Sequence, residues 1–372
     1  MTCRATLGVD DLTVLVEAPD HSTLTWLREF AGPDFDEREG RAPDVTIRAH
    51  ADDAAYETLR SAGPHPAGGS IECFAFDHHV EALPKWRAES GQLVVHDAAL
   101  NACYVRDPGG HQIELYSPAR NLSARLALLR VLRELAMAHR LRREDLLLHA
   151  AAVEWRGRAI AIAGPKKAGK TTLTLHLLHG TGSRFIANDR AAVSLGPAGV
   201  SVRGIPTIVR VRASSLDHLP ALRQRFQSSP FHHRWLMAEA ERRRVPSQRS
   251  SYDLTPAQLV RLLHAERSGE TPLAAVVFPR QTGGRGVAVT ELTGSETASR
   301  LRSSLFRARD TTVVGEFFAG ELVMSNRDAA CARVAEKIVG LECALGVDAY
   351  AEAGAASDLL RAFASYSVPT SR

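Results

Sequence analysis

Residues 158–189 read RAIAIAGPKKAGKTTLTLHLLHGTGSRFIAND, and this stretch decides how the chain around it folds. Its middle part, GPKKAGKT, matches in full the phosphate-binding pattern G-x-x-x-x-G-K-[ST]. Gly164 and Gly169 leave the backbone free to wrap closely around phosphate oxygens. Lys170 can reach the β- and γ-phosphates, and the Thr171 hydroxyl can bind Mg²⁺. The pattern therefore predicts a nucleotide-binding loop.

The residues on both sides of the loop favour the same interpretation over an accidental glycine-rich turn. Residues 159–163 are a short apolar run that enters the loop directly, as a buried strand does. The residues after the loop predict a helix with apolar positions at Leu173, Leu177 and Leu178, whose positive N-terminal end would face the phosphates. Five of the 46 Lys+Arg residues are lysines, and three of those five lie in the loop, where a slim ammonium fits between phosphates.

We therefore predict that ATP and Mg²⁺ bind at this loop. The residues expected to contact the nucleotide are Gly164, Pro165, Lys166, Lys167, Ala168, Gly169, Lys170, Thr171 and Thr172.

Two polar residues flank this region in the sequence. Asp189 ends an apolar run only 19 residues after Lys170, and it is interpreted either as a metal-organising acid or as a helix cap or turn residue. His149 lies inside the apolar run 146–153, one strand and one tight turn before the loop strand. The alternative to a catalytic role is that His149 is a structural histidine whose ring nitrogens are hydrogen-bonded within the core.

The order of these residues resembles a known family. A histidine, a strand, the phosphate loop, a helix, a strand ending in Asn188-Asp189-Arg190, and then Val202-Arg203-Gly204 is similar to the catalytic domain of HPr kinase/phosphorylase. That family comprises bacterial serine kinases with a P-loop core related to phosphoenolpyruvate carboxykinase. The resemblance covers roughly residues 146–212, and the histidine, the early Asp-Arg and the Arg-Gly in that order are its specific part.

The resemblance implies roles for individual residues. The expected catalytic residues are Asp189, His149 and Lys170, and the expected metal ligands are Thr171 and Asp189. Residues expected near the substrate are Asn188, Arg190, Arg203 and, from its place at the end of a predicted core strand, Arg280. Asn188 stands where the family has the first acid of an Asp-Asp pair, and Ser201 where it has a glutamate. Because an amide cannot act as a base, that role passes to Asp189 or His149.

Composition limits the remaining possibilities. The net charge of +4 does not by itself indicate a nucleic-acid partner, and the five cysteines form no metal-binding or disulfide pattern. The N-terminus has no signal-peptide pattern and no apolar run approaches membrane-spanning length, so we expect a cytoplasmic protein without a membrane partner.

The chain is long enough for two domains, and we predict an α/β fold throughout. Residues 1–118 are expected to form a small α/β docking or dimerisation domain, compatible with a homo-oligomer, and residues 119–142 a linker helix. Residues 143–325 are expected to form the HPr-kinase-like P-loop catalytic domain, and 326–372 a C-terminal helix, predicted over 328–346, and a tail. The arginine-rich stretch 203–249 is interpreted either as a solvated basic face or as a lid over an acidic substrate.

The expected function is an ATP-dependent kinase that transfers the γ-phosphoryl group to a hydroxyl acceptor. The acceptor would be a serine-type hydroxyl on a peptide or protein, or a small hydroxylated metabolite. A nucleotide-sensing regulator and an ATPase without an acceptor are the alternatives.

Overall fold

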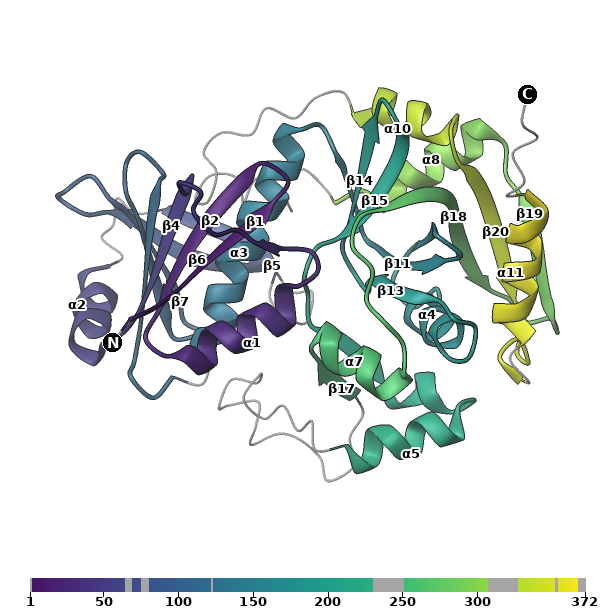
Figure 1. Ribbon diagram of the computed structural model, residues 1–372, viewed down its shortest axis with the longest axis horizontal. Coiled ribbons are helices and arrows are strands. Elements are labelled where there is room, and N and C mark those ends of the chain that lie inside the picture. Colours follow the sequence, from purple (N-terminus) through teal and green to yellow (C-terminus); the bar gives the residue numbers. More distant parts are fainter. Residues whose placement is uncertain are drawn as a thin grey trace. The chain divides into compact units, whose positions relative to one another are not determined.

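The computed structural model describes residues 2–63, 69–74, 80–121, 123–229, 251–306, 327–351 and 354–366, and Figure 1 shows the order of the elements. Contacts divide the described chain into two compact units, one ending at Arg142 and one beginning at Arg143. Both units combine helices with a mixed sheet, which confirms the predicted α/β class. In the described part of the chain, no helix is both long enough and apolar enough to cross a membrane.

The first unit is built on one mixed sheet in the order β3-β1-β2-β4-β9-β8-β7-β6-β5. Its strands are β1 (Cys3–Val9), β2 (Leu12–Ala18), β3 (Asp36–Glu37), β4 (Val45–Ala51), β5 (Gly69–Phe74), β6 (Val80–Arg87), β7 (Leu93–Asp97), β8 (Ala102–Arg106) and β9 (Gln112–Ser117). Strands β2, β4 and β9 are parallel neighbours, and β9 to β5 form an antiparallel series. Strands β8 and β9 form an antiparallel hairpin around residues 107–110.

The helices of the first unit are α1 (His21–Ala31), α2 (Asp53–Ala62) and α3 (Ala124–Arg142). Helix α3 falls in the region predicted to be a linker, and it packs against α1 and β9. Two of its arginines are buried in ion pairs within the same unit: Arg130 pairs with Asp97, and Arg140 pairs with Asp10 at 3.0 Å. Buried charges are tolerated when they are paired in this way.

The second unit contains the sheet that carries the predicted phosphate loop, in the order β10-β14-β15-β18-β12-β11-β13, with β20 beside β18 and β19 beside β20. Its strands are β10 (Leu146–Leu148), β11 (Ala150–Trp155), β12 (Arg158–Ala163), β13 (Arg184–Ala187), β14 (Ala191–Gly196), β15 (Gly199–Gly204), β16 (Val209–Arg212), β17 (Ser251–Leu254), β18 (Thr271–Gln281), β19 (Val287–Glu291) and β20 (Val339–Leu345). Its helices are α4 (Lys170–Leu178), the 3-10 helix η1 (Ala213–Leu216), α5 (Pro220–Ser228), α7 (Pro256–Leu263), α8 (Gly294–Ser304), α10 (Arg327–Ala335) and α11 (Gly354–Tyr366).

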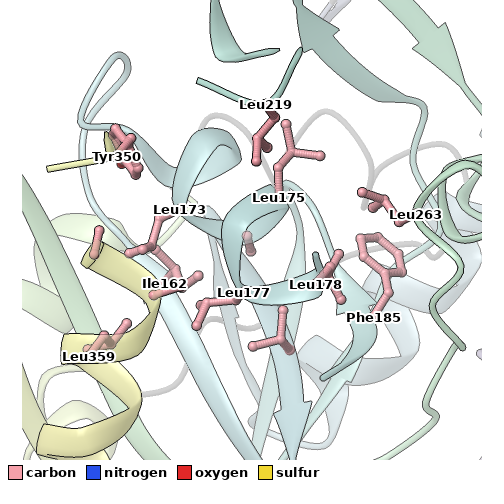
Figure 2. Close-up of a cluster of buried hydrophobic side chains, with 14 of the residues drawn as sticks. Ile162, Leu173, Leu175, Leu177, Leu178, Phe185, Leu219, Leu263, Tyr350 and Leu359 are labelled. Carbon is pink, nitrogen blue, oxygen red and sulfur yellow. The ribbon is translucent and has the colours of Figure 1, made fainter. Parts of the chain in front are cut away.

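Strand β12 is buried on both faces because helices cover both sides of the sheet. Ile160 and Ile162 pack into one hydrophobic cluster with leucines of α4 and α11, as Figure 2 shows for Ile162, Leu173 and Leu359. The alanines that alternate with these isoleucines pack on the other face with residues of α8 and α10. Strands β12, β18 and β20 are parallel, so their carboxyl ends lie at one edge of the sheet. Ligands of open α/β sheets bind at such an edge.

One sequence expectation changes in this unit. The helix predicted over 328–346 is wrong beyond Ala335, because Val339–Leu345 is strand β20 and pairs in parallel with β18. Residues 339–345 therefore lie within the sheet, between β18 and β19, and α11 follows them. The arginine-rich stretch predicted over 203–249 contains β16, η1 and α5, and its residues 230–250 lie outside the described residues.

Candidate functional site

The predicted phosphate loop connects β12 to α4, as the sequence pattern indicates. Gly164 has φ 146° and Gly169 has φ 99°, values that favour glycine because it has no Cβ. A Cβ on Gly169 would lie 2.9 Å from the Gln281 Nε2 atom and 3.2 Å from the Tyr350 hydroxyl. The backbone therefore favours glycine at both positions, and at Gly169 the Gln281 side chain would also have to shift to admit a Cβ.

Lys170 is the first residue of α4 and is only 9% exposed. Its Nζ donates hydrogen bonds to the carbonyl oxygens of Gly164 at 2.7 Å and Pro165 at 3.1 Å, so the side chain folds back over the loop. Burial lowers the pKa of the ammonium from its ordinary value of 10.5, and the negative charge of Asp189 opposes this shift. Lys170 is thus held at the loop and is in electrostatic contact with Asp189.

His149 and Asp189 form the central pair of the site. The His149 Nε2 atom lies 2.9 Å from the Asp189 Oδ1 atom. An ionised carboxylate can only accept hydrogen bonds, so Nε2 carries the hydrogen that is donated. The side chains are 32% and 30% exposed, which leaves both accessible to a substrate.

Sheet pairing explains why these distant residues meet. Ala150, which follows His149, pairs with Ala163 at the end of β12. Ala187, two residues before Asp189, pairs with Ala152 on the other side of β11. The histidine, the acid and the beginning of the loop are therefore brought to the same edge of the sheet.

Arg190 lies beside this pair, with its Nε 3.9 Å from the Asp189 Oδ2 atom. The guanidinium carbon of Arg190 is 5.1 Å from the ring centroid of Phe306, and the His149 ring stacks on the same phenyl ring. Phe306 was not identified from the sequence because it lies more than a hundred residues downstream of the motif, and no local pattern links it to the site.

The structure gives the other expected substrate residues different partners. Arg203 pairs with Glu270 at 3.1 Å, and the Ser201 hydroxyl donates to the same carboxylate at 2.6 Å. Arg280 is exposed and pairs with Glu342 at 3.0 Å. Asn188 follows β13 directly in the chain, and it is half-buried.

The remaining loop residues divide by exposure. Pro165, Lys166 and Lys167 are exposed, whereas Ala168 is buried. Thr171 and Thr172 are both half-buried, and the Thr172 hydroxyl donates to the Ser215 hydroxyl at 3.2 Å. Gln281 and Tyr350 adjoin Gly169 but belong to distant parts of the sequence, so the motif alone could not identify them.

The oxygen donors near the loop suit Mg²⁺ only in combination with a nucleotide. Thr171 and Asp189 offer one hydroxyl and one carboxylate, and the described residues contain no group of three or more His, Cys, Asp or Glu side chains able to hold a metal by themselves. Mg²⁺ commonly keeps several waters and takes its other ligands from one or two carboxylates and from substrate phosphates. Thr171 and Asp189 would therefore supply only part of such a set, with phosphate oxygens of a bound nucleotide and waters supplying the rest.

Thr171→Ala is expected to raise the Mg²⁺ concentration needed for half-maximal activity by about 10- to 100-fold, the range for disturbing the ligand environment of a metal. The matched control is Thr174→Ala, which removes another hydroxyl of α4, one that donates to the Lys170 carbonyl at 2.8 Å. A Mg²⁺ titration of activity at fixed ATP measures the effect. If the two variants shift the midpoint equally, Thr171 is not a metal ligand.

Nucleotide affinity is expected to fall as the pH rises toward 10.5. Because the pKa of Lys170 is lowered, the side chain loses its positive charge at a lower pH than an exposed lysine does. Calorimetric titration with a non-hydrolysable ATP analogue at increasing pH measures this. Lys170→Arg, whose guanidinium stays charged, should show a flatter dependence. A parallel fall in both proteins would assign the titration to another group.

No protein-family model matches the chain, and a search of curated proteins finds no match.

Proposed function

We propose that this protein is an ATP-dependent phosphotransferase with a P-loop kinase core of the HPr-kinase-like kind. The single observation that supports the proposal best is the 2.9 Å contact between His149 and Asp189 at the sheet edge where Lys170 closes the loop. A phosphate-binding pattern alone is shared by many nucleotide-binding proteins. An acid–histidine pair beside it supplies what a hydroxyl acceptor needs, a positioned group that takes its proton.

In the proposed reaction the acceptor oxygen forms a bond to the γ-phosphorus while the bond from that phosphorus to the β-phosphate oxygen breaks, releasing ADP. Asp189 takes the acceptor proton, and His149 orients the carboxylate through Nε2. Lys170 counters the negative charge that spreads over the transferred group. Mg²⁺ held with Thr171 and Asp189 would supply further charge neutralisation. Positioning and electrostatics contribute most of the rate in this class of reaction.

The acceptor proposed is a serine-type hydroxyl of a peptide or protein, or a small hydroxylated metabolite. Arg190 lies beside the acid and supports an acceptor or leaving phosphate that carries negative charge. Arg203 and Arg280 already bond to Glu270 and Glu342, so they support this role less directly. A cytoplasmic location is part of the proposal, and the free thiols of the described cysteines are compatible with a reducing compartment.

A second candidate is a nucleotide sensor or an ATPase without an acceptor. The observation that favours it is Asn188, an amide at the position where the resemblance places the first acid. An amide cannot accept a proton, so the chain would retain nucleotide binding with a weakened transfer step.

Measurement of ADP formation separates these functions. The protein is incubated with Mg·ATP alone and then with pools of serine peptides and hydroxylated metabolites, and acceptors are inspected by mass spectrometry for an added phosphoryl group. ADP that appears only with an acceptor supports the kinase. ADP without an acceptor identifies an ATPase, and ATP binding without ADP identifies a sensor.

A further inference from the structure

Phe306 contacts two of the polar side chains of the site at once. Its ring centroid lies 6.0 Å from that of His149, with the planes inclined by 29°, and the guanidinium carbon of Arg190 lies 5.1 Å from the same ring. Both His149 and Arg190 also approach Asp189, at 2.9 Å and 3.9 Å. The phenyl ring therefore contacts both side chains that approach the proposed base, Asp189.

The backbone fixes Phe306 against the histidine. The His149 amide donates to the Ser304 carbonyl at 2.8 Å, and the Phe306 amide donates to the Leu147 carbonyl at 3.0 Å. The residues between these two bonds form an antiparallel β-bridge. The Phe306 carbonyl accepts a further bond from Arg327 Nη1 at 2.8 Å. The end of α8 is thus joined to the segment that carries His149, so main-chain pairing holds the backbones of Phe306 and His149 side by side.

An ordinary core role would place the phenyl ring among aliphatic side chains. The preceding residue has such a role: Leu305 packs against the hydrophobic cluster formed by the alanines of β12 with residues of α8 and α10. The Phe306 side chain is half-buried and lies against an imidazole and a guanidinium instead. An aromatic face attracts a guanidinium and stacks with an imidazole, and both interactions depend on the ring and not only on its volume.

We propose that Phe306 is a positioning residue that holds the His149 and Arg190 side chains around Asp189. The inference rests on the proposed function, in which Asp189 takes the acceptor proton. Without the ring, the imidazole and the guanidinium would sample other rotamers, and the Asp189 carboxylate would lose its fixed direction toward the acceptor. The phosphate loop should be little affected, because the contacts described for Lys170 and Gly169 do not involve Phe306.

Three variants test the proposal. Phe306→Leu keeps an apolar side chain but removes the ring, Phe306→Ala removes both, and Phe306→Tyr keeps the ring. We expect Leu and Ala to lower kcat by about 10- to 100-fold, the scale for small misplacement of a reacting group, with a smaller change in the KM for ATP. Tyr should restore most of kcat. Thermal unfolding of each variant checks that it is folded.

A spectroscopic measurement separates this inference from the proposed function. The His149 ring protons are assigned by NMR through their loss in His149→Gln, and their chemical shifts are compared among the Phe306 variants. Loss of the ring current should move them in Leu and Ala but not in Tyr. If the Leu variant keeps both kcat and the His149 shifts, or if Tyr loses as much as Leu, the positioning role is wrong. If the wild-type protein transfers no phosphoryl group, the kinase proposal fails, while the shifts still decide whether the Phe306 ring lies against His149.

Discussion

Lys170→Ala is expected to lower phosphoryl transfer by about 10²- to 10³-fold or more, the cost of removing one preorganised group that stabilises transition-state charge. The ammonium already lies at the loop, because Nζ bonds to the carbonyl oxygens of Gly164 and Pro165. A bound phosphate can replace these two acceptors and draw the same side chain toward its own oxygens. Single-turnover measurement of ADP formation reports the transfer step directly.

The controls for this variant address packing and charge separately. Lys170 is 9% exposed, so its methylene stem is buried and Lys170→Ala removes packing as well as charge. Lys170→Met keeps an apolar stem of similar length without the ammonium, and it should be as inactive as the alanine variant while unfolding closer to the unchanged protein. Normal turnover in a folded Lys170→Ala protein would contradict the kinase assignment.

Local sequence patterns were sufficient for the loop and its flanking elements. The strand over 159–163 and the helix beginning at Lys170 are confirmed, because an apolar run, two glycines and a lysine specify this turn without help from distant residues. The fold then had to supply the 2.9 Å distance between His149 and Asp189. Their order in the chain suggested a shared site, but only the pairing of β11 with both β12 and β13 brings them together.

Features that depend on distant segments could not be predicted. A helix was predicted over 328–346, yet residues 339–345 form strand β20, which pairs in parallel with the distant strand β18. Arg203 and Arg280 look alike in the sequence as cations near a phosphate site. The structure pairs Arg203 with Glu270 and Arg280 with Glu342. Both glutamates lie far from their arginines in the sequence, and no motif identifies them. Phe306 was not predicted as a site residue for the same reason.

Asp189→Asn is expected to lower kcat by about 10² to 10⁴, the usual span for losing a general base. An asparagine keeps the size of the side chain, and its amide oxygen can still accept the hydrogen bond from His149 Nε2, so the local geometry should persist. What the variant loses is the ability to take a proton and the negative charge near Lys170. If Asp189 acts mainly as a metal ligand, the same substitution should instead raise the KM for ATP and the Mg²⁺ midpoint.

His149→Ala is expected to be milder than Asp189→Asn, because the imidazole orients the base and does not itself accept the proton in the proposed reaction. Steady-state rates at saturating Mg·ATP compare the two variants. The assignment is falsified if Asp189→Asn keeps near-normal kcat under these conditions. His149 would then be the base, and the 2.9 Å contact would mean that Asp189 orients the histidine rather than the reverse.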